Sequence, residues 1–573
     1  MNFSETLTGG FPIKMAAAVE NILRVAARAA TYNVILQVSF RLLTFLVNAL
    51  VLRYVSSELL GLVNVRLTLL YSSILFLSRE AFRKACLSRS NNSSTKNWRQ
   101  VINLVWCCVP VGCVTGAILG WLWVKILEHP SETYDNKYSV AVGVYALCAI
   151  FELTVEPLWL IGQEFHFVHA RVLIEATALA AKCLSSIFFI ILHPNSAFTW
   201  FCVSQVVHTV CYVSLYYLYF MYYSVNQSQN SKKLKGEQKT QNYELLEGFP
   251  LTKVTDVLPS FDSVGNDWID PTYGKLVLSF IKQSILKQFL TEGERYIMTV
   301  FNVLSFAQQG IYDVINNLGS LVARFVFLPI EDSYYVLFCQ ILVRGKQHKN
   351  TKELETAGRI LSGVLKFVSL TGLIIMVFGF SYSYLALDIY GGKLLSSGGG
   401  PTLLRWYCVY VLIIAVNGIT ECFMFALMSK DEVDHYNHYM VAFSLVFLVA
   451  SLGLTKGFGS VGFILANCIN MGLRIIHSNM FIQKYFADSH QNPLLKALPS
   501  RFVSALLLLS FVITAVSESV FCCGSGWIYK IFHIAVGAVC LLTVFAAIFL
   551  TESDFIMFLK EQWTGKLIKK KDE

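Results

Sequence analysis

Long apolar runs alternate with short polar connections along most of this chain. A helix needs about 20 mainly apolar residues to cross the hydrocarbon core of a bilayer. Runs of this length lie at 32–54, 60–82, 101–126, 138–162, 168–192, 198–223, 276–303, 309–342, 360–386, 403–429, 436–455, 460–483, 500–521 and 527–550. The pattern predicts an all-α polytopic membrane protein with about fourteen transmembrane helices.

One long polar stretch, rich in Lys, Gln, Ser and Asn, divides the series of apolar runs. Such a composition is typical of a solvated linker. The predicted organisation is a cytosolic N-terminal tail at 1–31, an N-lobe of helices 1–6 at 32–223, a cytosolic linker at 224–275, a C-lobe of helices 7–12 at 276–483, helices 13–14 at 484–550, and a basic cytosolic tail at 551–573.

The composition agrees with a membrane protein and argues against a soluble enzyme. Of the 573 residues 55% are apolar and only 14% are charged, whereas soluble chains have roughly 25% charged residues. The sequence contains no GxxxxGK[ST] loop, no HExxH and no GxSxG elbow, so nucleotide-driven, zinc-dependent and serine-hydrolase chemistries are not indicated. We therefore expect no enzymatic activity, no cofactor and no metal.

The basic residues indicate how the helices are oriented. Clusters of Lys and Arg lie at 14–28, 83–99, 232–253, 344–352 and 566–571, and an even number of spans places all five on one side. The positive-inside rule makes that side cytosolic. Both termini are then predicted to be cytosolic. The chain has 46 basic and 37 acidic residues. Because the basic clusters are explained by membrane topology, we expect no nucleic-acid partner.

Ionisable side chains within the predicted spans are the candidates for function. Each costs about 2.5–3.5 kcal/mol at the bilayer centre on insertion scales, so it should face protein or a water-filled cavity. Spacing i, i+4, i+7, i+11 places four polar residues on one helical face in two helices, at Gln37, Arg41, Thr44 and Asn48 and at Asp313, Asn317, Ser320 and Arg324.

Two interpretations of these charges remain open. Acids and bases could neutralise one another between helices and simply hold them together. Alternatively, cations without matching acids could receive an anion, and between Arg41 and Arg66 the only acid is Glu58 in a loop. Arg and Lys both suit phosphate oxygens.

Several of these segments resemble the Rft family of endoplasmic-reticulum membrane proteins. The likeness is carried by Asn64–Tyr71, Ser78–Arg83, Leu290–Tyr296, Asn316–Arg324, Leu387–Gly392 and Ser460–Cys468, within a match from about Met15 to Glu552. The family is associated with translocating the mannosylated chitobiose pyrophosphate dolichol intermediate of N-glycosylation. The resemblance implies a two-lobe fold like that of the multidrug/oligosaccharidyl-lipid/polysaccharide exporters, with fourteen helices.

The resemblance and the charges together predict a glycolipid transporter. The dolichol pyrophosphate oligosaccharide would move from the cytosolic to the lumenal leaflet by alternating access, its pyrophosphate held in a positively lined cavity between the lobes. The predicted pyrophosphate contacts are Arg41, Arg66, Lys282, Lys287, Arg295 and Arg324. The residues predicted to orient them or to form gating ion pairs are Asn64, Arg79, Glu80, Arg83, Glu292, Glu294, Asp313, Asn317 and Glu331.

Two other functions fit the same sequence. A non-transporting accessory protein could bind the glycolipid, or glycosylation enzymes as partners, without moving lipid, since a retained fold need not retain an activity. A cation-coupled multidrug exporter would use the acids Glu152, Glu156 and Asp313 as an ion site. The C-terminal Lys570 and Lys571 resemble a dilysine retrieval signal, which agrees with a multi-pass protein of the endoplasmic-reticulum membrane whose partners are membrane lipid and the glycolipid.

Overall fold

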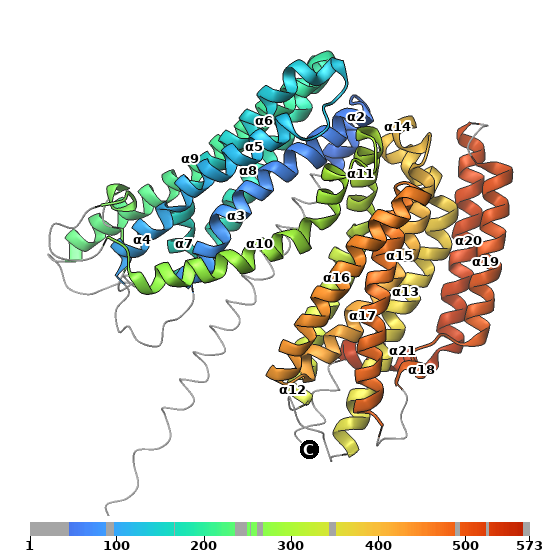
Figure 1. Cartoon of the computed structure of the whole chain (residues 1–573). Coiled ribbons are helices and arrows are strands. Elements are labelled where there is room, and N and C mark those ends of the chain that lie inside the picture. The colour runs from blue at the N-terminus through green and yellow to red at the C-terminus, as the bar shows by residue number, and fades with distance from the viewer. Residues whose placement is uncertain are drawn as a thin grey trace, which may run out of the picture. The chain divides into compact units, whose positions relative to one another are not determined.

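The computed structural model describes residues 45–564 except 88–96, 166, 235–248, 252–253, 261–267, 343–350, 488–492 and 523–525. The chain divides into two compact units (Figure 1). Unit 1 contains Met1–Val55 and Leu67–Gln288, and unit 2 contains Ser56–Arg66 and Phe289–Glu573. The predicted N-terminal tail, Arg41 and the two terminal lysines lie outside the described residues.

Unit 1 is a bundle of helices. Its helices are α3 (Thr68–Leu87), α4 (Trp98–Trp106), α5 (Cys108–Lys125), α6 (Glu132–Leu153), α7 (Glu156–Glu164), α8 (Val168–Leu192), α9 (Ala197–Leu234), the short turns η2 (Pro194–Ser196) and η3 (Val254–Val257), and the first part of α10 (Pro271–Val300). α3 packs against both α5 and α6, and α8 against α9. α9 continues ten residues past 224, where the linker was predicted to begin.

The polar segment after α9 is attached to unit 1 at its described residues. The Trp106 indole donates a hydrogen bond to the Val257 carbonyl at 2.6 Å. The Asn103 side chain donates to the Ser260 carbonyl at 3.0 Å and accepts from the Ser260 amide at 3.0 Å. These contacts hold the residues around η3 against α4.

Unit 2 contains the remaining helices. They are α2 (Ser57–Leu60), η1 (Gly61–Leu67, whose last residue belongs to unit 1), the end of α10, α11 (Phe306–Val322), η4 (Ala323–Phe327), α12 (Leu328–Ile341), α13 (Thr351–Gly391), α14 (Lys393–Ser396), α15 (Gly400–Leu427), α16 (Lys430–Phe458), α17 (Val461–Tyr485), α18 (Pro493–Lys496), α19 (Arg501–Phe521), α20 (Trp527–Thr551) and α21 (Ser553–Thr564). α15 lies at the centre, packed against α11, α12, α13 and α17.

Glycines permit a close helix crossing inside unit 2. A Cβ at Gly61 would overlap the carbonyl oxygen of Phe306, and a Cβ at Gly310 would overlap that of Ser57. Backbone atoms cannot move aside as a flexible side chain can. The start of the α2–η1 segment is therefore packed directly on the first turns of α11.

The all-α multi-pass fold is confirmed. Eleven described helices are long and apolar enough to cross a membrane, or twelve if α6 and α7, which meet at a 42° bend, form one broken span. Two predicted spans account for the difference from about fourteen. The span at 32–54 lies mostly outside the described residues, and α10 carries Lys282, Lys287, Glu292, Glu294 and Arg295 along its length.

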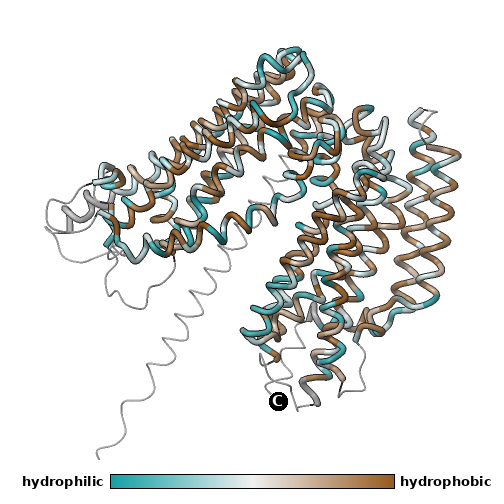
Figure 2. Tube along the Cα trace, in the orientation of Figure 1, coloured by the Kyte–Doolittle hydropathy of each residue, from teal (hydrophilic) through white to brown (hydrophobic). Residues whose placement is uncertain are grey.

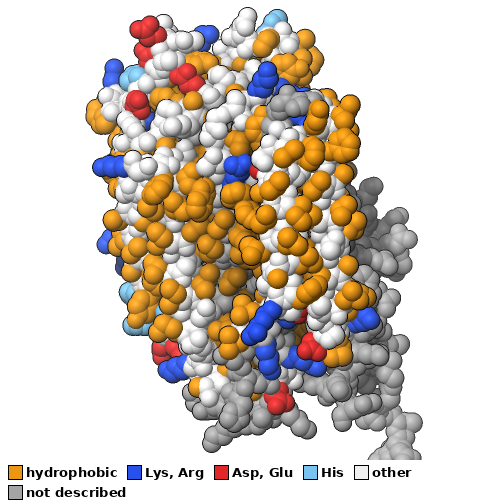
Figure 3. Space-filling model, turned by 90° about the vertical axis from the view of Figure 1, so that its right-hand side faces the viewer, with side chains coloured by type: hydrophobic (Ala, Val, Ile, Leu, Met, Phe, Trp, Pro, Cys, Tyr) orange, Lys and Arg blue, Asp and Glu red, His pale blue; other side chains and the backbone are white. Residues whose placement is uncertain are grey.

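The exposed surface of the helices is suited to lipid. Figure 2 shows hydrophobic residues along most of the helix lengths, with hydrophilic residues concentrated near the ends. In the view of Figure 3, apolar side chains cover the middle of one face, which includes α19 and α20, and most charged side chains lie toward its ends. Leu508, Leu542 and Leu550 on these two helices are exposed. This arrangement matches a hydrocarbon environment.

Candidate functional site

Two of the predicted pyrophosphate contacts lie in π-helical turns. Arg66 is in the last turn of η1, and Arg324 is in the last turn of η4. Each turn interrupts a long helical segment, from Ser57 to Leu87 and from Phe306 to Ile341. π-turns inside α-helices are often found at functional sites. Asn64, predicted to orient the cations, lies half-buried in η1 as well.

Arg66 is held entirely inside unit 2. Its side chain has no exposed surface. Its Nη2 donates a hydrogen bond to Asn302 Oδ1 at 2.9 Å, and the guanidinium carbon lies 4.9 Å from the centre of the Phe306 ring. Asn302 itself has a left-handed backbone with φ 48°. In this structure Arg66 therefore links η1 to the segment before α11.

Arg295 forms a small polar cluster with acids of the same unit. It binds Glu292 at 3.2 Å and Asp313 at 3.1 Å, and Asn317 donates to the other oxygen of Asp313 at 3.1 Å. The adjacent Glu294 accepts a hydrogen bond from Tyr312. All three acids were predicted to orient cations, and Glu292 and Asp313 do pair with one here. The contacts connect the end of α10 to α11.

Unit 1 contains a second ion-pair cluster, which is built around two buried carboxylates. Arg79 approaches Glu152 at 3.3 Å and Glu156 at 3.4 Å, while Arg83 donates to Glu156 at 2.6 and 2.8 Å. The Arg83 guanidinium also lies 3.6 Å from the centre of the Trp159 ring. The two carboxylates come from opposite sides of the α6–α7 bend. The cluster therefore ties α3 to both halves of the broken helix.

Of the two lysines of α10 that were predicted to contact pyrophosphate, one forms an ion pair and the other does not. Lys287 binds Glu80 at 2.9 Å, and Glu80 is also 3.8 Å from Lys84. Lys282 is exposed and forms no hydrogen bond or ion pair with a described residue, and the same holds for Arg324 in unit 2. Lys282 and Arg324 are thus predicted contacts that form no ion pair with a described acid.

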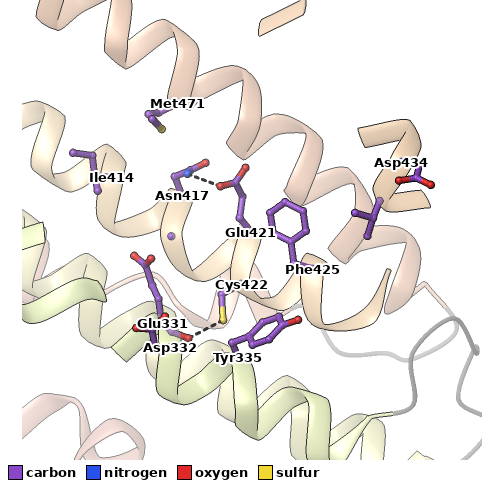
Figure 4. A pocket seen from close by; sticks show the side chains of 12 residues that line it. Glu331, Asp332, Tyr335, Ile414, Asn417, Glu421, Cys422, Phe425, Asp434 and Met471 are labelled. Carbon is purple, nitrogen blue, oxygen red and sulfur yellow. Dashed lines mark hydrogen bonds between the residues drawn. The ribbon is translucent and has the colours of Figure 1, made fainter. Parts of the chain in front are cut away.

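Glu331 lies in a pocket within unit 2 that the sequence did not predict. The pocket has a volume of about 690 Å³, and side chains of α12, α15, α16 and α17 form its walls (Figure 4). At its edge, Glu421 accepts from Arg474 at 2.7 and 2.6 Å, from Tyr436 at 2.5 Å and from Asn417 at 3.0 Å.

Asn417, Glu421 and Arg474 were not predicted as site residues, but their spacing in the sequence does indicate polar helix faces. Asn417 and Glu421 are four residues apart, the spacing that places two side chains on one face of a helix. Arg474 lies on the polar face that runs through Asn467, Asn470 and His477. What periodicity could not show is that α15 and α17 turn these faces toward each other.

Comparison with known proteins gives a consistent result. A family model described as Rft protein matches residues 25–562. The Man(5)GlcNAc(2)-PP-dolichol translocation protein RFT1 of Xenopus tropicalis is 46% identical over 543 residues, which cover 94% of this chain and 97% of that protein. The protein of the same name in Drosophila melanogaster is 38% identical, covering 86% of this chain and 91% of its own.

The architecture is similar to that of a solved structure. A chain described as lipid II flippase MurJ in an inward closed conformation matches with a TM-score of 0.57, covering 91% of this chain and 99% of that chain. At 12% identity this likeness concerns the fold alone. It confirms the predicted exporter-like fold.

Proposed function

Because the chain belongs to the Rft protein family, we propose that it is a transporter that moves an oligosaccharide-bearing dolichol pyrophosphate across the bilayer, and not an enzyme. The observation that carries this proposal is the match to translocation proteins over nearly the full length of both chains. The substrate is the one in their printed name, Man(5)GlcNAc(2)-PP-dolichol. We place the protein in the endoplasmic-reticulum membrane with both termini in the cytosol.

The charges of the structure support a pyrophosphate ligand. Lys282 and Arg324 have no acidic partner among the described residues, and an ionisable group within a membrane helix is costly unless it has a partner or water. A diphosphate supplies such a partner. Arg can bind two phosphate oxygens at once through parallel hydrogen bonds, and Lys binds them as a point charge. We propose these two residues, together with Arg41, as the contacts made during translocation.

The remaining predicted cations have a different part in this proposal. Arg66, Lys287 and Arg295 already bind groups of the protein. Contact with the headgroup would require each to exchange one of these partners for phosphate. We therefore assign Lys287 and Arg295, with the acids Glu80, Glu292 and Asp313, to ion pairs that change as the lipid passes.

A binding measurement tests the assignment of the two cations. Purified protein in lipid nanodiscs is titrated with dolichyl pyrophosphate. Losing a hydrogen bond to a charged group costs about 1.5–3 kcal/mol, so Lys282→Gln and Arg324→Gln should each weaken binding by about 10-fold or more. Lys137→Gln, an exposed lysine on α6, is the matched control. Equal affinity in all variants would refute the assignment.

The two alternative functions differ in what they require. An accessory protein would bind the glycolipid tightly and leave its leaflet unchanged. An ion-coupled exporter would need accessible acids, yet Glu152, Glu156 and Asp313 are buried and each pairs with an arginine. This arrangement favours the glycolipid transporter over the exporter.

A further inference from the structure

The pocket in unit 2 has walls rich in hydrogen-bond acceptors. Among the described lining residues are four acids, Glu331 and Asp332 from α12, Glu421 from α15 and Asp434 from α16, and no Lys or Arg (Figure 4). Its volume of about 690 Å³ falls in the range of roughly 300–1,000 Å³ that is usual for small-molecule sites.

Glu421 is already occupied by the protein. Both of its oxygens accept hydrogen bonds, in total from Arg474, Tyr436 and Asn417. A buried carboxylate with this many donors is stable where it is. Its effect is to fix the position of the Asn417 amide beside the pocket.

The other acceptors have no partners in the part of the chain that the structure describes. The carboxylates of Glu331, Asp332 and Asp434 form no hydrogen bond or ion pair with a described residue. The Glu331 carboxylate lies directly against Gly418, at a place that a Cβ at that position would occupy. Asn417 is only 6% exposed, and its Oδ1 has no hydrogen-bond partner among the described residues.

A buried amide oxygen without a donor is unfavourable, so a ligand that donates hydrogen bonds would stabilise this pocket. A diphosphate is excluded, because it would bring negative charge to four acids. No three acidic, His or Cys side chains of the described part of the chain are arranged to hold a metal ion.

A sugar has the required chemistry. Each hydroxyl can donate to a carboxylate or an amide oxygen, and the apolar face of a pyranose ring can lie on an aromatic side chain. Tyr335, which is 37% exposed, and Phe425 both line the pocket.

We infer that this pocket, formed by Glu331, Asp332, Asp434 and Asn417 with Tyr335 and Phe425, binds sugar hydroxyls of the transported lipid's oligosaccharide. The inference rests on the proposed function, which supplies the glycan. In this inference, different residues bind the two polar parts of the lipid headgroup. Lys282 and Arg324 contact the pyrophosphate, and the acid-lined pocket of unit 2 contacts the sugar.

The test compares two lipids on the full chain in nanodiscs, Man(5)GlcNAc(2)-PP-dolichol and dolichyl pyrophosphate without sugar. The measured quantity is the ratio of their dissociation constants for each variant. Glu331→Gln and Asp434→Asn should each lower the preference for the sugar-bearing lipid by about 10-fold and leave binding of the bare lipid unchanged. Asp431→Asn, one turn from Asp434 on the exposed first turn of α16, should change neither.

Each remaining result would overturn the inference in a recognisable way. An unchanged ratio in Glu331→Gln and Asp434→Asn, with wild-type protein still binding both lipids, rejects the sugar site and leaves the proposed function intact. Wild-type protein that binds neither lipid better than phosphatidylglycerol rejects both. Binding of spermine that these variants abolish, with no change in the lipid ratio, would make the pocket a site for organic cations instead.

Discussion

The buried ion-pair cluster of unit 1 gives the sharpest prediction about stability. In Glu156→Gln the side chain keeps its size and loses its charge. The carboxylate accepts from Arg83 at 2.6 and 2.8 Å and from Arg79 at 3.4 Å, and its side chain is only 4% exposed. After the substitution two guanidinium groups share the single carboxylate of Glu152.

The expected loss is large because both carboxylates of the cluster are buried. Removing one partner of a buried ion pair costs about 3–5 kcal/mol. Each kcal/mol lowers the midpoint of thermal unfolding by roughly 2–4 °C in a domain of 150–250 residues, and by less in a larger one. Unit 1 is larger than this, so at about 3 kcal/mol Glu156→Gln should unfold roughly 6 °C below the wild type, measured as the fraction that remains monodisperse after heating in detergent.

Two further variants show whether the loss comes from the ion pair. Glu132→Gln, at the exposed first turn of α6, should shift the midpoint by less than about 2 °C. The double variant Arg83→Gln/Glu156→Gln should lose less stability than the two single variants lose in sum, because the two residues are in contact. A midpoint for Glu156→Gln equal to that of Glu132→Gln would refute the structural role assigned to the cluster.

Two other regions give predictions of the same kind. Gly310→Ala places a methyl group against the Ser57 carbonyl, so it should destabilise the protein by about 1–3 kcal/mol in thermal unfolding, whereas Gly472→Ala, which has open space around it, should not. Burial would raise the pKa of Glu552, but hydrogen bonds from Lys366 and Ser500 outweigh it and hold the pKa below its usual value. At a pH above the ordinary pKa of a carboxyl group the Glu552 carboxylate thus stabilises the fold, and this contribution is lost as the pH falls through the lowered pKa. Glu552→Gln should therefore make the thermal stability less dependent on pH in the acidic range. An unchanged dependence would contradict the assignment.

The all-helical membrane fold could be predicted from the sequence because the length of an apolar run is a local property. The spacing of Asp313 and Asn317 even placed them correctly on one face, where the structure joins them by a hydrogen bond. The π-turns at η1 and η4 could not be predicted, since one extra residue per turn barely changes the hydrophobic pattern. They matter because Arg66 and Arg324 lie in them.

Pairing between distant helices was the part that the sequence left open. The structure shows ion pairs between helices for some of the membrane charges, and the binding of an anion by the others stays a prediction. Arg79 and Arg83 pair with acids that lie more than seventy residues away in the sequence. A spacing rule within one helix cannot predict such pairs. Arg324, by contrast, has no such acid among the described residues. Only tertiary structure separates these two groups of cations.

The central claim is that this protein itself moves the glycolipid between leaflets. The most direct measurement reconstitutes it into vesicles that contain Man(5)GlcNAc(2)-PP-dolichol in both leaflets, and follows the cleavage of the glycan by a membrane-impermeant mannosidase added outside. We predict that wild-type protein exposes the inner-leaflet lipid within the assay, and that Lys282→Gln/Arg324→Gln does so much more slowly while remaining folded. Cleavage that stops at the outer-leaflet fraction, as in protein-free vesicles, would contradict the account.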